Sequence, residues 1–168
     1  MRLLPFVFSI SLLLFCAASC TSIDCPVQNL VYTTYELKKG GGTTPDTLGT
    51  DTLWIRTRRN DGTDSLVLNS LYGDAATVFK LPISYTQPED VFFTQLRDTA
   101  GNQYLDTIRI KKENIPHFES VDCQAAYFHT ITAVSTTHNA IDSLIIHHPE
   151  VNYDITITHY YLYLKDRH

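Results

Sequence analysis

Seven histidines lie in the last third of the chain, and histidine is well suited to metal binding and to proton transfer near neutral pH. They are His117, His129, His138, His147, His148, His159 and His168. In extended strands, residues two apart share a face, so His129, His159 and one of His147 and His148 could converge if their strands are neighbours. No H-x-H or H-E-x-x-H spacing occurs. We therefore expect scattered surface or core histidines and no metal site.

The sequence holds no motif for other catalytic chemistry. There is no G-x-S-x-G nucleophile motif. The aspartates precede β-rich runs, where solvated caps of turns explain them. We therefore expect no catalytic residue, no cofactor and no enzymatic activity, and a metal-dependent enzyme is the alternative that the histidines leave open.

Aromatic side chains could stack on sugar rings. The candidates for such a platform are Trp54, Phe92, Phe93, Tyr160, Tyr161 and Tyr163. In a β-sandwich, however, alternation places many aromatic residues in the core. A glycan-binding face is therefore an alternative hypothesis.

The first residues, MRLLPFVFSISLLLFCAASC, have a basic start followed by an apolar run. The run over residues 3–18 is shorter than the roughly 20 residues of a spanning helix. We expect residues 1–19 to be a secretory signal peptide, with an uncleaved anchor as the alternative. The sequence Ala17-Ala18-Ser19-Cys20 resembles a bacterial lipobox, which implies that Cys20 is lipidated and begins a tether over residues 20–28. A cut near Ala18 or Ser19 would instead leave Cys20 as an ordinary thiol.

The four cysteines are Cys16, Cys20, Cys25 and Cys123. Removal of the signal and lipidation of Cys20 would leave two, and in an oxidising envelope we expect a Cys25–Cys123 disulfide. Closing a loop of about 100 residues would stabilise the fold by about 4–5 kcal/mol. A metal site or a nucleophilic thiol is the alternative, without the support of C-x-x-C spacing.

The net charge of −5 argues against nucleic acid as a partner, because phosphate binding relies on many positive charges on one face. The densest cationic group is Arg56, Arg58 and Arg59. We expect this group at a solvated hairpin tip.

The pattern along the chain is β throughout, without a sustained 3.6-residue apolar period. We expect strands near residues 29–38, 51–59, 64–70, 77–83, 90–97, 103–112, 117–123, 126–135, 141–148 and 154–164. The pair Asp61-Gly62 fits a type I′ hairpin, and residues 98–102 form a second hairpin connection. The pattern predicts one all-β, immunoglobulin-like antiparallel β-sandwich of about 8–10 strands over residues 29–168, with a closed barrel as the alternative.

Alternation predicts which strand faces are buried. Leu53 and Ile55 face one way, opposite Thr52 and Trp54. Residues 77–83 should form a short or edge strand because of Pro82. The run 154–164 becomes apolar on both faces, so we expect it to lie centrally or at an interface.

A triplet of Asp, then Ser or Thr, then a small or aliphatic residue occurs six times in the sequence. The amino-acid composition alone predicts about one such triplet. The hydroxyl residues are Thr47, Thr52, Ser65, Thr99, Thr107 and Ser143. The triplet resembles the O-glycosylation acceptor of Bacteroidetes envelope proteins, which implies glycosylated hydroxyls. A structural reading, in which aspartate ends a turn before a strand, is equally open. Sites in loops, such as Thr47 and Thr99, are better candidates than mid-strand Thr107.

Further residues carry a second resemblance. Cys20-Thr-Ser-Ile-Asp-Cys25-Pro precedes a β-rich opening, Asp122-Cys123 precedes an aromatic strand, and Asn152-Tyr-Asp154 precedes a tyrosine-rich last strand. Together they resemble a family of small uncharacterised Bacteroidetes envelope lipoproteins. That resemblance implies an outer-membrane lipoprotein, facing the periplasm or the cell surface, and it assigns no activity.

We therefore expect a lipid-anchored β-sandwich with a non-enzymatic binding or scaffolding role. Its partners would be the membrane, through the N-terminal lipid, and an envelope protein. A glycan-binding accessory module and a pilus or adhesin subunit are the alternatives.

Overall fold

The computed structural model describes residues 30–59 and 61–166. Every regular secondary-structure element within these ranges is a β-strand. They are β1 (Tyr32–Lys38), β2 (Gly49–Arg58), β3 (Asp64–Gly73), β4 (Val78–Pro82), β5 (Glu89–Arg97), β6 (Gln103–His117), β7 (Ala126–Thr136), β8 (Ile141–Ile146), β9 (Glu150–Val151) and β10 (Tyr160–Leu164). The predicted all-β class is confirmed. The described residues hold no helix able to span a membrane. The predicted signal peptide, residues 1–19, and the tether, residues 20–28, lie outside them.

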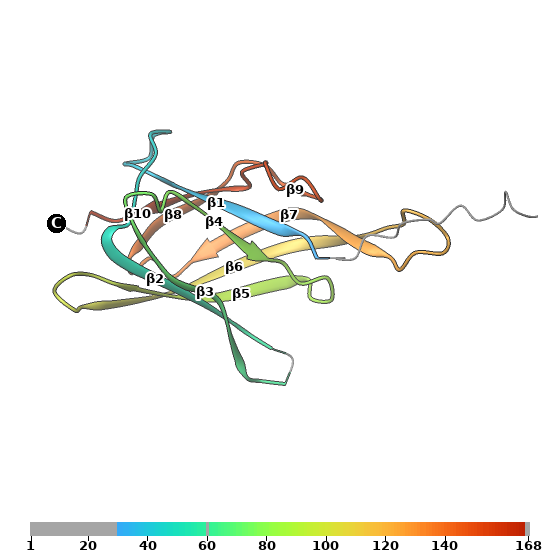
Figure 1. Cartoon of the computed structure of the whole chain (residues 1–168), viewed down its shortest axis with the longest axis horizontal. Helices are drawn as coiled ribbons and strands as arrows, with labels where there is room; N and C mark the ends of the chain where they lie inside the picture. The colour runs from blue at the N-terminus through green and yellow to red at the C-terminus, as the bar shows by residue number, and fades with distance from the viewer. Residues whose placement is uncertain (1–29, 60, 167–168) are drawn as a thin grey trace, which may run out of the picture.

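The strands form two sheets that face each other (Figure 1). The smaller sheet has the order β4-β1-β10-β8, and the larger has the order β3-β2-β5-β6-β7-β9. All strand pairs are antiparallel except β1 with β10. The result is a sandwich, as predicted, with β4 short and at an edge. The last strand lies between β1 and β8, so its predicted central position is confirmed.

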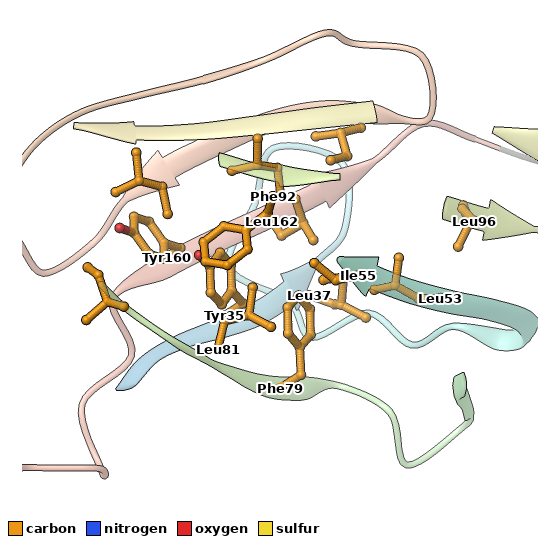
Figure 2. Packing of buried hydrophobic residues seen from close by; sticks show 14 of the residues in the cluster. Tyr35, Leu37, Leu53, Ile55, Phe79, Leu81, Phe92, Leu96, Tyr160 and Leu162 are labelled. Atoms are coloured by element: carbon orange, nitrogen blue, oxygen red, sulfur yellow. The ribbon is translucent and has the colours of Figure 1, made fainter. Parts of the chain in front are cut away.

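The inward faces of the two sheets form one apolar core (Figure 2). The ring of Tyr35 in β1 stacks on Phe79 of β4, with ring centroids 4.9 Å apart. The ring of Tyr160 in β10 also packs against Tyr35, with ring centroids 4.7 Å apart. Leu53 and Ile55 of β2 are buried in this core, as the alternation predicted. Burying each large apolar side chain contributes about 1.5–3 kcal/mol, which makes the core the main source of stability.

Two hairpins in the larger sheet share one turn geometry. The Gly62 N–H donates to Arg59 O, and the Arg59 N–H donates to Thr63 O. Residues 98–102 repeat both bonds, and Gly62 and Gly101 have φ angles of +83° and +88°. In a type I′ turn centred on Asp61-Gly62, Gly62 would be a central residue, but its N–H closes the turn by donating to Arg59 O. The type I′ prediction is therefore wrong, and in both hairpins the glycine takes the left-handed position after the turn.

Two predicted strand boundaries are wrong as well. Residues 117–123 do not form a strand, because β6 runs on to His117 and residues 118–125 turn back into β7. Residues 154–159 do not extend β10. Asp154 accepts hydrogen bonds from the Thr156 N–H and hydroxyl at 2.9 and 2.6 Å, and this local turn competes with strand pairing. The short strand β9 was not predicted.

Candidate functional site

A buried ion pair lies on the inner face of the larger sheet. Lys112 of β6 places its Nζ 3.2 Å from Asp90 Oδ2 of β5, and the two side chains are 0% and 9% exposed. Burial raises the pKa of Asp90 and lowers the pKa of Lys112, because each charged form loses water, while their mutual attraction opposes both changes. Removing one partner of such a pair would strand a buried charge.

Hydrogen bonds extend the pair into a network with β7. Asn114 Oδ1 accepts from Lys112 Nζ at 3.1 Å and lies 2.8 Å from His129 Nδ1. Asn114 Nδ2 donates to the Gln87 carbonyl at 3.1 Å, so Oδ1 must be the acceptor for both neighbours. His129 therefore carries its proton on Nδ1. Burial, and then the charge on Lys112, lower the pKa of His129 to about 4.

The network holds the loop over residues 83–88, which connects the two sheets. The Ser84 N–H donates to both oxygens of Asp90 at 3.2 and 3.3 Å. Lys112 Nζ and Asn114 Nδ2 both donate to the Gln87 carbonyl. The charged groups are thus saturated by the loop and by one another. Their arrangement fixes the backbone of this loop.

Under this loop lies a pocket of about 580 Å³. Residues 57–59, 82–87 and 89–92, together with Leu30, line it. Most of this lining comes from the loop that the network fixes and from the adjoining strand β5. The pocket can therefore keep its shape without a ligand.

A second anchored carboxylate fixes the chain where it crosses from β7 to β8. Asp106 Oδ1 accepts from the Thr137 hydroxyl and the Asn139 N–H, both at 2.7 Å. Its Oδ2 accepts from the Ala140 and Ile141 N–H groups at 2.7 and 3.0 Å. Burial acts to raise the pKa of Asp106, but these four hydrogen bonds to the charged form lower it below its usual value.

The sequence of residues 52–164 matches a family of unknown function, DUF6452. The chain belongs to this family. The match runs from β2 to β10, so it includes the Asp90–Lys112 network and Asp106, whereas Cys20 and Cys25 precede it. No curated protein and no solved structure matches the chain. Membership in the family supports the resemblance to an uncharacterised family and assigns no activity.

The histidines do not gather at one place in this family member. His129 belongs to the Lys112 network, while His159 Nδ1 accepts the Thr34 N–H at 3.0 Å. His148 lies near His159, with ring centroids 6.3 Å apart, and His147 stacks on Tyr161. Among residues 30–59 and 61–166, no three His, Cys, Asp or Glu side chains are grouped as metal ligands. His168 lies outside the described residues.

The six aromatic candidates do not form one exposed platform, because several lie in the core as the alternation indicated, and glycan binding stays a hypothesis. Phe92, Tyr160 and Tyr163 are buried. Tyr161 packs against His147 on the smaller sheet. Trp54 and Phe93 remain, half-buried on the outer face of the larger sheet.

Cationic side chains lie along the same outer face as Trp54 and Phe93. They are Arg56, Arg58, Arg97, Arg109 and Lys111, and we call the seven residues together the basic face. Arg58 Cζ lies 5.6 Å from the centroid of the Phe93 ring. Arg56 Nη1 donates to Gln95 Oε1 at 3.2 Å, and Arg109 pairs with Glu89 at 2.8 Å. Beside Arg109 and Lys111, the small residues Ala133 and Ser135 leave a shallow depression of about 370 Å³.

The hydroxyl residues of the six triplets differ in accessibility. Thr99 is exposed at the hairpin between β5 and β6. The other five are half-buried, and only Thr47 among them lies in a loop. The aspartates of the triplets also accept hydrogen bonds. Asp98 accepts the Asn102 N–H at 2.8 Å, and Asp106 accepts the four bonds above. Asp46, Asp64 and Asp142 accept from Thr47, Arg58 and Ser143. These partners support the structural reading, and glycosylation stays a prediction.

Cys123 is buried at 8% exposure and is disulfide-bonded. Cys16, Cys20 and Cys25 lie outside the described residues. Pairing with Cys25 and lipidation of Cys20 therefore stay predictions.

Asp90, Lys112 and Asn114 were not among the residues that the sequence pattern predicted to be functional. A signal for two of them was present in β6, because Lys112 and Asn114 follow Ile108 and Ile110 at alternate positions and so lie on the same strand face. Ile108 and Ile110 are fully buried. A charged residue on a buried strand face needs a partner inside the protein. Its partner could not be found without the strand order.

Proposed function

We propose that this protein is a lipid-anchored cell-envelope β-sandwich that binds or braces an envelope protein without catalysing a reaction. Its anchor would be the lipid on Cys20, and its location the outer membrane, in keeping with the resemblance to Bacteroidetes lipoproteins. The ionisable groups of the interior support a non-enzymatic role, because Asp90 and Lys112 are occupied with the loop that they hold. The contact with a partner must then be made at the surface.

The basic face is the observation that carries this proposal. The chain has a net charge of −5, yet the outer face of β2, β5 and β6 carries five cationic side chains together with two aromatic ones. The side chains of Arg97 and Lys111 form no hydrogen bond or ion pair with any described residue, so both charges are available to a partner. Aromatic residues and arginine are also the types enriched at the centres of protein interfaces. The partner surface should therefore be acidic.

A site-specific photo-crosslinker in living cells tests this role. Leu105 is 62% exposed on the same outer face, and Val78 is 43% exposed on β4 of the other sheet. A crosslinker at position 105 should capture one envelope protein, and one at position 78 should not. Arg97→Glu with Lys111→Glu should abolish the capture, whereas Lys80→Glu on β4 should leave it intact. Capture that persists in the variant with both Arg97→Glu and Lys111→Glu would refute the protein-binding role, and so would the absence of any captured protein.

Glycan binding is the second candidate, and one arrangement favours it. Trp54 pairs with Gln95, and Phe93 pairs with Arg56, so two aromatic rings lie diagonally beside two hydrogen-bonding side chains. Sugar recognition commonly combines a stacking ring with such polar groups. In the same experiment, a polysaccharide adduct at position 105 that is lost in Trp54→Ala would support this candidate.

A further inference from the structure

Large apolar side chains are exposed at one end of the sandwich. In the loop over residues 118–125, Phe118 is 66% exposed and Val121 is 99% exposed. Leu30 and Tyr85 are 45% and 51% exposed. We call these four residues the apolar tip. Exposed apolar residues are common singly, but a group of them marks a contact site.

The four residues belong to the same end of the molecule. Leu30, Tyr85 and Tyr127 line a small pocket of about 160 Å³ together with Gln124 and Ala125 of the loop that carries Phe118 and Val121. The rings of Tyr85 and Tyr127 stack with centroids 5.7 Å apart. Figure 1 shows the loop between β6 and β7 at one end of the long axis, with the hairpin between β5 and β6 toward the other end.

Chain length ties this end to the proposed anchor. Leu30 is ten positions after Cys20, so a fully extended chain spans at most about 36 Å between them. Cys123 lies in the same loop as Val121 and is disulfide-bonded. If its partner is Cys25, that disulfide is five positions after Cys20, and the reach falls to about 18 Å. The loop would then be held against the surface into which the lipid inserts.

We propose that Phe118 and Val121 insert into the interfacial region of the lipid bilayer, beside the acyl chains on Cys20. This inference rests on the proposed lipid anchor. A bilayer interface accepts aromatic and aliphatic side chains that water disfavours. Glu119 and Asp122 flank the apolar residues and would remain among the headgroups. Because both are acidic, the contact should not require anionic lipid.

Tryptophan fluorescence in vesicles tests the contact with the full-length, lipidated protein. Trp54→Phe removes the chain's single tryptophan. In that background, Val121→Trp places a reporter on the tip, and Thr99→Trp places a matched reporter on the exposed hairpin toward the other end. Both positions are exposed, so neither substitution should disturb the core. Equal thermal unfolding of the two variants would confirm this.

Each variant is reconstituted into phosphatidylcholine vesicles with dibrominated acyl chains, and flotation measures anchoring separately. We expect both variants to float, with quenched, blue-shifted emission for Val121→Trp and unquenched emission for Thr99→Trp. Flotation without quenching of the Val121→Trp reporter would overturn the tip contact and leave the anchor intact. Failure to float would overturn the anchor and, with it, the contact. A blue shift that depends on protein concentration, without quenching, would assign the tip to a second copy and overturn the proposal.

Discussion

Asp90, Lys112 and His129 place ionisable side chains inside the sandwich, at the end where the loop over residues 83–88 crosses between the sheets. The cost of burying them is offset by hydrogen bonds that fix this loop and the pocket beneath it. Breaking the Asp90–Lys112 pair by removing one partner would leave an uncompensated charge in the interior. The ionisable residues of the interior therefore shape a surface pocket.

His129 should make stability depend on pH. Its pKa is about 4 in the folded protein, against an ordinary value of 6.5, so the unfolded chain binds a proton more readily between these values. Protonation then favours unfolding, and His129 should lower the free energy of unfolding by about 3 kcal/mol as the pH falls from 6.5 to 4. Chemical denaturation across this range measures the effect.

The variant His129→Gln should flatten this pH dependence, because glutamine does not titrate but can still donate to Asn114. His147→Gln is the matched control, since His147 is exposed. An unchanged slope in His129→Gln would show that other groups produce the effect. The sequence showed that histidines were abundant, but which of them are buried depends on the strand order, which local patterns do not encode.

Aspartates near the ends of strands hold two connections in place. Asp106 lies close to the start of β6, and its four hydrogen bonds fix the connection through which the chain leaves the larger sheet for β8. Asp98 holds the hairpin before the same strand. The repeated Asp-Ser/Thr triplets thus include positions where the carboxylate has a structural task.

Asp106→Asn should destabilise the fold by about 2–4 kcal/mol at neutral pH, because an amide nitrogen in place of Oδ2 leaves two buried N–H groups without an acceptor. Folding lowers the pKa of Asp106, so its contribution is present above the ordinary value near 3.8 and is lost as the pH falls through the folded value. The difference between the wild type and Asp106→Asn should therefore shrink below about pH 4. Denaturation at pH 7 and pH 3 measures both effects.

Asp64→Asn supplies the control, since Asp64 is exposed beside Arg58 and should cost less than about 1 kcal/mol. Equal losses in the two variants would show that Asp106 has no special role at this connection.

Period-two alternation and turn residues predicted most strands to within a few residues, including the alternation in β2 and the edge position of β4. The false strand at residues 117–123 arose because β6 runs through Pro116 and pairs with Tyr127, a long-range contact invisible in the local sequence. The parallel pairing of β1 with β10 joins residues more than 120 positions apart, and no local pattern reports it.

At the scale of the whole molecule, the surface is divided among three regions. The loop that carries Phe118 and Val121 lies at one end of the long axis, and the hairpin with Thr99 lies toward the other (Figure 1). The basic face lies on the outer side of β2, β5 and β6. With the tip on the bilayer, the basic face would stand beside the membrane and be open to an envelope protein. Thr99 would project away from the membrane, where a glycan would meet no obstruction.

The account depends above all on lipidation of Cys20, which would place the sandwich on a membrane and orient its surfaces. Mass spectrometry of the N-terminal peptide, from mature protein purified out of the membrane fraction, tests this directly. We predict a peptide that begins at Cys20 and carries both a diacylglyceryl group and an N-linked acyl chain. A peptide that begins at another residue, or at an unmodified Cys20, would contradict the account.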